Sequence, residues 1–158
     1  MKKITFPITE EQLKDLKSGD RVLASGYLYT ARDAAHKRMS ETLAEGGRIP
    51  IDLKDNIIYY MGPSPAREGR VIGSAGPTTA SRMDKYTPAL LDLGLGGMIG
   101  KGKRSKEVID AIIRNKSISV RVGFIIWVNH KIYKFILYKV MIHKWIKTKP
   151  TITLPQEI

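Results

Sequence analysis

Hydrophobic and polar positions along the first 115 residues change repeatedly between a strand period and a helix period. Short apolar runs bounded by turn residues predict strands, and apolar positions three or four residues apart predict helices. Strands are expected at residues 21–26, 57–60, 70–73 and 97–100. Strands that alternate with helices in this way indicate a mixed α/β domain.

Capping residues predict where the helices begin. Thr9, with Gln12 three residues later, has the pattern of a capping box. Two more helices are expected to begin at Thr30 and Ser105. Each carries apolar residues along one face, namely Ala35, Met39 and Leu43 in the first and Val108, Ile109, Ile112 and Ile113 in the second.

Residues 73–84 and 100–105 combine glycines, neighbouring threonines and four cationic side chains. Flexible backbone, hydroxyls and fixed positive charge together indicate a site for a small, multiply charged anion. The segment from Thr79 to Leu93 between them is predicted to be helical, with Thr87-Pro88 beginning a short helix that Gly94 ends. Residues 62–65 are predicted to form a turn.

Composition sets limits on the function. The chain of 158 residues has no cysteine, so it cannot itself hold an iron–sulfur cluster or a thiolate zinc. Its start has no apolar run of signal-peptide length, and no uninterrupted apolar stretch reaches about 18 residues. We therefore expect a cytoplasmic protein that has no membrane partner.

The net charge of +12 would ordinarily favour nucleic acid as a partner. Most of this charge lies after residue 115, where eight Lys and Arg residues face one acid, a net of +7. Residues 1–115 carry 19 basic and 14 acidic residues, a net of only +5. The basic character therefore belongs mainly to the C-terminal segment.

Two common nucleotide-binding patterns fail. A phosphate loop ending at Gly100-Lys101 would need glycine at position 95, which is leucine, and Gly102 follows the lysine. The dinucleotide fingerprint begun by Gly94-Leu-Gly96 reaches Ile99 where its third glycine should stand. Neither pattern supports nucleotide binding.

Thr78 and Arg82 are candidates for chemistry. With a helix beginning near Thr79, the Arg82 guanidinium could return towards the Thr78 hydroxyl, favour its alkoxide and clamp a carboxylate. The alternative is that Thr78 and Thr79 cap the helix and Arg82 is solvated.

Arg32, just inside the helix expected from Thr30, would form an anion site with the helix N-terminus, or be an ordinary surface arginine. His36, one turn later, is more often a structural histidine than a base. Lys101, between two glycines, would project as a mobile cation.

Four motifs in this order and spacing resemble the β subunit, or C-terminal domain, of class I fumarate hydratases and L-tartrate dehydratases, which are iron–sulfur hydro-lyases. The motifs are Thr30-Ala-Arg-Asp-Ala-Ala-His-Lys-Arg38, Gly62-Pro-Ser-Pro-Ala-Arg-Glu-Gly69, Gly76-Pro-Thr-Thr-Ala-Ser-Arg-Met-Asp84 and Lys101-Gly-Lys-Arg-Ser105. The resemblance covers about residues 1–115 and does not specify one substrate.

The resemblance implies a swivelling β/β/α domain, with a mixed sheet and flanking helices. A partner α subunit, in an α2β2 assembly, would hold a [4Fe–4S] cluster through its own cysteines, and this chain would hold no metal. Thr78 would match the base that removes a proton next to a carboxylate. Arg32, Arg82 and Lys101 would match the residues that hold the dicarboxylate substrate.

The resemblance ends near residue 115, so we divide the chain into a hydro-lyase β-subunit domain (1–115) and an atypical basic segment (116–158). Family members continue with a Val-Tyr-Phe-type strand and a glycine- and alanine-rich stretch, whereas this chain becomes rich in lysine and isoleucine. A reading-frame shift near residue 116 and a divergent natural C-terminus are both open. Two other functions remain alternatives: a basic nucleic-acid-binding or accessory module, and a defective β subunit that no longer assembles.

Overall fold

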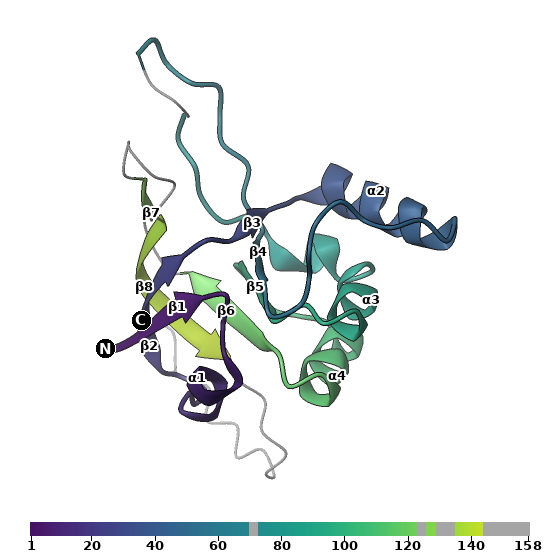
Figure 1. Ribbon diagram of the computed structural model, residues 1–158. Helices are drawn as coiled ribbons and strands as arrows, with labels where there is room; N and C mark the ends of the chain where they lie inside the picture. The colour runs from purple at the N-terminus through teal and green to yellow at the C-terminus, as the bar shows by residue number, and fades with distance from the viewer. Residues whose placement is uncertain (70–72, 123–125, 129–134, 144–158) are drawn as a thin grey trace.

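The computed structural model describes residues 1–69, 73–122, 126–128 and 135–143 (Figure 1). The strands are β1 (Lys2–Phe6), β2 (Arg21–Gly26), β3 (Tyr29–Thr30), β4 (Ile57–Tyr59), β5 (Gly97–Gly100), β6 (Ile118–Val122), β7 (Ile126–Val128) and β8 (Phe135–His143). The helices are α1 (Glu10–Lys14), α2 (Asp33–Ala44), the 3₁₀ helix η1 (Ala80–Met83), α3 (Thr87–Asp92) and α4 (Lys106–Arg114).

The strands form one mixed sheet in the order β1-β2-β8-β6-β5-β4-β3, and β7 pairs with β8. Strands β3 to β6 are parallel neighbours, and β1 and β2 form a second parallel pair. The two groups are joined by β8, which is antiparallel to both β2 and β6. The parallel group places the ends of β3, β4 and β5 along one edge of the sheet.

Two apolar clusters give the fold its layers. One contains residues of β1 and β2 together with residues from β4, β5 and β6, so the sheet curls and its two parts pack face to face. The other lies between the sheet and α2, η1, α3 and α4, which cover the opposite face (Figure 1). This β/β/α layering, a mixed sheet with flanking helices, confirms the predicted fold class.

Strand β4 shows why both faces are covered. Ile57 and Tyr59 belong to the first cluster, Ile58 and Tyr60 belong to the second, and all four are fully buried. A continuous apolar run is the pattern of a strand that is buried on both sides. The buried strand predicted at 57–60 is confirmed as β4, which ends one residue earlier, at Tyr59, and the strands at 21–26 and 97–100 are confirmed with the predicted bounds.

Two predicted caps are confirmed. The Thr9 hydroxyl accepts from the Gln12 amide and the Gln12 side chain accepts from the Thr9 amide, which completes the capping box. Ser105 caps α4 by accepting a hydrogen bond from the Val108 amide.

The prediction that Thr30 begins the second helix is wrong. Thr30 ends β3, and the Ala31 amide still donates to the Tyr59 carbonyl at 3.1 Å. This pairing keeps the chain extended up to Arg32, which is the N-cap of α2 and makes no side-chain cap hydrogen bond. Arg32 therefore lies at the helix boundary and not inside the helix.

The continuous helix predicted from Thr79 to Leu93 is broken into η1 and α3. Pro88 has no amide hydrogen to continue a helix from Asp84, so it is tolerated only in the first turn of α3. The Thr87 hydroxyl donates to the Met83 carbonyl at 2.8 Å, which links the two short helices. Gly94 ends α3, as predicted. Its φ of +99° is a backbone conformation that glycine adopts readily and that does not continue a helix.

The turn predicted at residues 62–65 is replaced by extended chain. These residues form one side of an arm that projects from the sheet edge (Figure 1). Met61 pairs with Pro77 at its base, and the Ser64 amide donates to the Ser74 carbonyl at 2.9 Å. Two prolines favour extended backbone for themselves and the residues before them. The strand predicted at 70–73 falls mainly on residues outside those described.

No described helix has both the length and the apolar character needed to cross a membrane.

Candidate anion-binding site at the carboxyl edge of the sheet

The predicted site residues gather where the parallel strands end. Arg32 follows β3, and Lys101 directly follows β5. Thr78 is distant in sequence from β4, but its amide donates to the Tyr60 carbonyl at 2.7 Å. The Lys101 amide donates to the Thr78 carbonyl at 3.2 Å, so backbone hydrogen bonds hold these segments together. The carboxyl edge of a parallel sheet is a common place for ligand sites.

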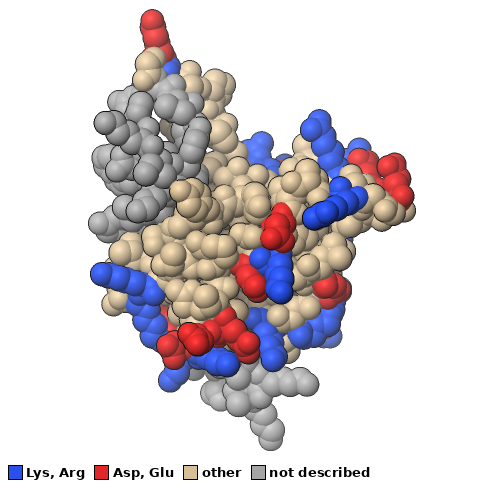
Figure 2. Space-filling view, viewed as in Figure 1, with Lys and Arg blue, Asp and Glu red and all other residues tan. Residues whose placement is uncertain are grey.

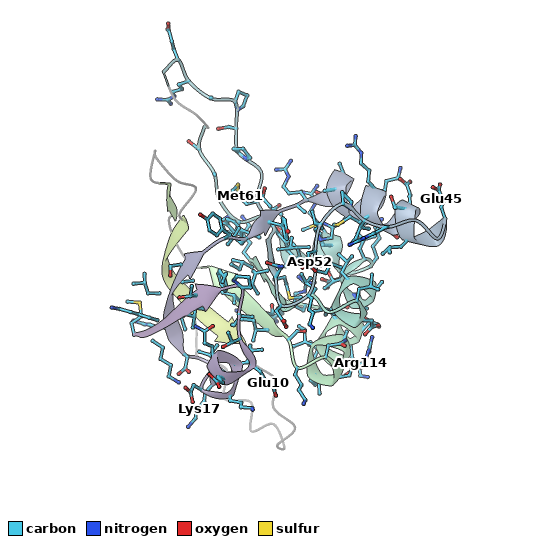
Figure 3. All side chains as sticks on the ribbon, viewed as in Figure 1. Glu10, Lys17, Glu45, Asp52, Met61 and Arg114 are labelled. Atoms are coloured by element: carbon cyan, nitrogen blue, oxygen red, sulfur yellow. The ribbon has the colours of Figure 1, made fainter. Side chains whose placement is uncertain are left out.

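Arg32 lies against the base of the arm. Its guanidinium rests directly on Gly62, where an added Cβ atom would stand 2.8 Å from both Cζ and Nε of Arg32. Met61, labelled in Figure 3, marks this base beside the ends of β3 and β4. A side chain at position 62 would therefore occupy the place of the Arg32 guanidinium.

Arg82 pairs with Asp33, the first residue of α2. Its Nε donates to Oδ1 at 3.0 Å, and its Nη2 lies 3.0 Å from Oδ2. The expectation that this guanidinium returns to the Thr78 hydroxyl is wrong: within the described residues, its side-chain partner is Asp33. A carboxylate is the stronger partner, since it offers two charged acceptors in the geometry of the guanidinium.

Thr78 and Lys101 present free polar groups. Thr78 is half-buried, and its hydroxyl has no hydrogen-bond partner among the described residues. The capping alternative fails for Thr79, which is the N-cap of η1 but makes no side-chain cap hydrogen bond. Lys101 is exposed, and its ammonium makes no ion pair in the described part of the chain. Both groups are available to a ligand.

A buried polar cluster supports these loops from behind. The side chains of Arg104 and Asp84 are only 6% and 11% exposed, and Arg104 Nη2 lies 2.9 Å from Asp84 Oδ1. Arg104 also donates to the Thr87 hydroxyl at 2.8 Å, and its guanidinium lies 5.3 Å from the centre of the Tyr60 ring. Asp84 Oδ2 accepts from the Ser105 amide at 2.7 Å. The cluster ties the end of η1 to the loop that carries Lys101.

His36 belongs to this buried layer, which confirms its interpretation as a structural histidine. It is fully buried, and its ring meets that of Tyr60 edge-on at 5.1 Å. Its Nδ1 lies 2.9 Å from the Arg32 carbonyl, which can only accept, so Nδ1 carries the proton. Burial lowers the pKa of His36, and the nearby positive charge of Arg104 lowers it further. The imidazole therefore stays neutral near pH 7 while it holds the Arg32 backbone.

Asp33, Gly62 and Arg104 were not identified as site residues from the sequence. Each lies inside a motif quoted above, so proximity to the candidate residues was the available signal. Their roles depend on partners far along the chain, as for Asp33 and Arg82, which are 49 residues apart. No group of three or more His, Cys, Asp or Glu side chains that could hold a metal occurs among the described residues.

The chain resembles known proteins over most of its length. It is 44% identical over 103 residues to fumarate hydratase 2 of Leishmania major, a match that covers 64% of this chain and 18% of that protein. It is 41% identical over 109 residues to the aerobic class I fumarate hydratase of Salmonella typhimurium, covering 66% of this chain and 19% of that protein. A third relative is the putative L(+)-tartrate dehydratase subunit beta of Methanocaldococcus jannaschii, 37% identical over 105 residues, covering 65% of this chain and 54% of that protein.

The matched region thus spans about a fifth of these fumarate hydratases and about half of the tartrate dehydratase subunit. A family model described as the fumarase C-terminus matches residues 1–125, which is most of the chain. The sequence motifs quoted above lie within this match, as does the whole carboxyl-edge site. This chain therefore belongs to the fumarase C-terminus family, the C-terminal domain of class I fumarate hydratases.

Proposed function

We propose that this chain is the β subunit of a hydro-lyase that interconverts a 2-hydroxy dicarboxylate and its dehydrated product. Malate with fumarate, and tartrate with oxaloacetate, are the two candidate pairs, as in the relatives' names. The observation that carries the proposal is that three separate segments bring one free hydroxyl and three cations to the same edge of the sheet, in a member of this family. The four residues are Thr78, Arg32, Arg82 and Lys101.

The chemistry of dehydration suits this set of groups. The Thr78 hydroxyl, as its alkoxide, would take the proton from the carbon next to a carboxylate; a C=C bond then forms as the neighbouring hydroxyl leaves. Negative charge grows on that carboxylate as the proton departs, and preorganised cations stabilise it. Arg32, Arg82 and Lys101 would bind the two carboxylates, and their positive charge would favour the alkoxide form of Thr78 without a direct contact between Arg82 and that hydroxyl.

This chain cannot be the whole enzyme under this proposal. It has no cysteine, and its described residues offer no cluster of metal ligands, so they do not fit a [4Fe–4S] cluster. A partner α subunit would hold that cluster, whose open iron supplies Lewis-acid chemistry. The subunit name of the tartrate dehydratase relative supports such a partner, and we propose an α2β2 complex in the cytoplasm.

A basic nucleic-acid-binding module remains the second candidate because of the charge of residues 116–158. On the face drawn in Figure 2, however, basic and acidic side chains of the described residues are interspersed, and they form no continuous basic surface. The acidic side chains on this face weigh against a nucleic-acid surface there, and we propose that no specific nucleic acid is bound. DNA binding that is salt-sensitive and survives deletion of residues 116–158 would favour this second candidate.

The test is co-expression with an α-type subunit of the family under anaerobic conditions, followed by assays with malate, tartrate and methyl-substituted analogues. Thr78→Ala should lower kcat by about 10²-fold or more, the range expected for loss of a general base. Thr79→Val is the matched control, since Thr79 is the exposed neighbour and makes no side-chain cap bond. Equal loss in both variants, or full activity in Thr78→Ala, would contradict the proposal.

A complex that does not form would point to a defective subunit. Sequencing the gene around codon 116 in independent isolates separates the two explanations of the basic segment. An intact frame in all isolates would refute the frame-shift hypothesis, and isolates that encode a glycine- and alanine-rich stretch would support it.

A further inference from the structure

We infer that Asp33 is a positioning residue, which orients the Arg82 guanidinium for a dicarboxylate without touching the substrate itself. The inference rests on the proposed function and adds a residue to its site. It starts from one contact, the two-point pairing of Asp33 with Arg82 across 49 residues of sequence.

The geometry of the pair leaves one side of the guanidinium free. An arginine has five N–H donors, and Asp33 engages one on Nε and one on Nη2. Three donors therefore remain, two of them on Nη1, on the end of the guanidinium away from Asp33. The Arg82 side chain makes no other hydrogen bond or ion pair among the described residues. A substrate carboxylate can bind this free end in the same two-point geometry.

The pair also controls where the free end lies. Arg82 stands on η1, a single turn of 3₁₀ helix, and its side chain is 56% exposed. A long exposed side chain has many rotamers, and ordering it costs conformational entropy that a ligand would otherwise have to supply. Asp33 stands at the start of the 12-residue helix α2, next to Arg32. It thereby anchors Arg82 to a rigid element beside a second cation.

The charge balance of the site agrees with this role. Arg32, Arg82 and Lys101 contribute three positive charges and Asp33 one negative charge, which leaves +2. A dicarboxylate carries two negative charges, so the site matches it. Loss of the Asp33 charge would leave the positive charge in excess and Arg82 without its anchor.

The experiment uses the complex with its α subunit and a double-mutant cycle. Asp33→Asn should lower kcat/KM by about tenfold to a hundredfold, since misplacement by about 1 Å can cost 10²-fold. In an Arg82→Ala background the same change should have less than a twofold effect, because its only route is through Arg82. Asp33→Glu, which keeps the carboxylate, should recover part of the activity. Similar losses in both backgrounds would show a structural role and overturn the inference.

Asp92→Asn is the matched control. Asp92 pairs with Arg114 in the same manner, with Nε to Oδ1 at 2.8 Å and Nη2 to Oδ2 at 2.6 Å. Its exposure is similar, and Figure 3 shows Arg114 at the end of α4, far from Met61 at the site edge. Asp92 also accepts from the Asn115 side chain at 2.7 Å, so the control should lose at least as much stability as Asp33→Asn and none of the activity. An equal loss of activity in both Asp→Asn variants would contradict the inference.

A readout without turnover separates this inference from the proposed function. In ¹H–¹⁵N spectra of the full chain alone, the Arg82 Nε–H should exchange slowly with water in the wild type and in Asp92→Asn, and rapidly in Asp33→Asn. Titration with L-malate should shift this signal in the wild type. Slow exchange that persists in Asp33→Asn overturns the positioning role, whatever the complex does. A wild-type complex without turnover, or an active Arg82→Ala complex, refutes the proposed function.

Discussion

We predict that the substitution Gly62→Ala damages the candidate site and leaves the fold intact. An added Cβ atom would stand 2.8 Å from Cζ and Nε of Arg32 and 2.9 Å from its Nη1. Carbon atoms in contact normally lie about 3.5–4.0 Å apart, so in Gly62→Ala the guanidinium has to retreat by ~1 Å. The Arg32 head group is the exposed end of a flexible side chain, and it can move without disturbing the core.

The magnitude follows from this displacement. A shift of about 1 Å in a substrate-holding group can cost 10²-fold in rate, which corresponds to about 2.7 kcal/mol of transition-state stabilisation. The stability of the fold should not fall in the same way. Gly62 does not have a positive φ, and replacing such a glycine with alanine stabilises a protein by about 0.4–1 kcal/mol through the unfolded state. The melting temperature should therefore stay the same or rise by up to about 4 °C.

The assay pairs steady-state turnover of the complex with thermal melting of this chain. Gly76→Ala, at the other side of the same arm, is the neutral control, since an added Cβ there meets nothing within 4 Å. Gly97→Ala is the opposite control, because its Cβ would lie 2.5 Å from the Ile118 backbone oxygen and should destabilise the sheet. Normal kcat/KM in Gly62→Ala, or a melting temperature as low as that of Gly97→Ala, would refute the reasoning.

Three further predictions concern stability. Arg104→Met should lower the free energy of unfolding by about 3–5 kcal/mol in urea titrations, because it leaves the buried Asp84 carboxylate without its charge partner; adding Asp84→Asn should recover part of the loss. Burial lowers the pKa of His36 in the folded chain. As the pH falls, the histidine of the unfolded chain is therefore protonated first, which favours unfolding. The contribution of His36 to stability should be complete above about pH 6.5 and smaller below it. His36→Phe should reduce this acid-dependent loss in melts between pH 5 and 7, and an unchanged slope would contradict the assignment. Ser105→Ala should cost about 1 kcal/mol, since it removes the cap on the Val108 amide, and the loss should be absent in Ser105→Asp.

The elements set by local pattern were predictable from the sequence. The buried strand at 57–60 follows from an apolar run, and the caps Thr9 and Ser105 follow from residue type and spacing. The beginning of α2 was misplaced because Thr30 has the chemistry of a cap, whereas pairing of β3 with β4 decides its conformation. Local propensity was overridden by a tertiary contact, which no single-sequence pattern contains.

The residues of the candidate site could be predicted from the sequence, but the contacts between them could not. Arg32, Thr78, Arg82 and Lys101 were identified by the resemblance, and the fold brings their segments to one edge of the sheet. Their roles in catalysis and binding stay predictions. The pairing of Arg82 could not be predicted, because Asp33 becomes its neighbour only when α2 and η1 pack together.

The place of β8 in the sheet bears on how the chain folds as it is made. β8 lies between β2 and β6 and hydrogen-bonds to both. It therefore covers the one edge of each strand that would otherwise have no partner. The β2 strand ends at residue 26 and β8 begins at residue 135, so 108 residues separate them. At about 5–20 residues per second of synthesis, the edge of β2 waits roughly 5–20 s for its partner. During that interval the unpaired edge of β2 is exposed to other chains, whereas β6, which ends at residue 122, is completed only shortly before β8, so the risk of wrong pairing falls mainly on β2.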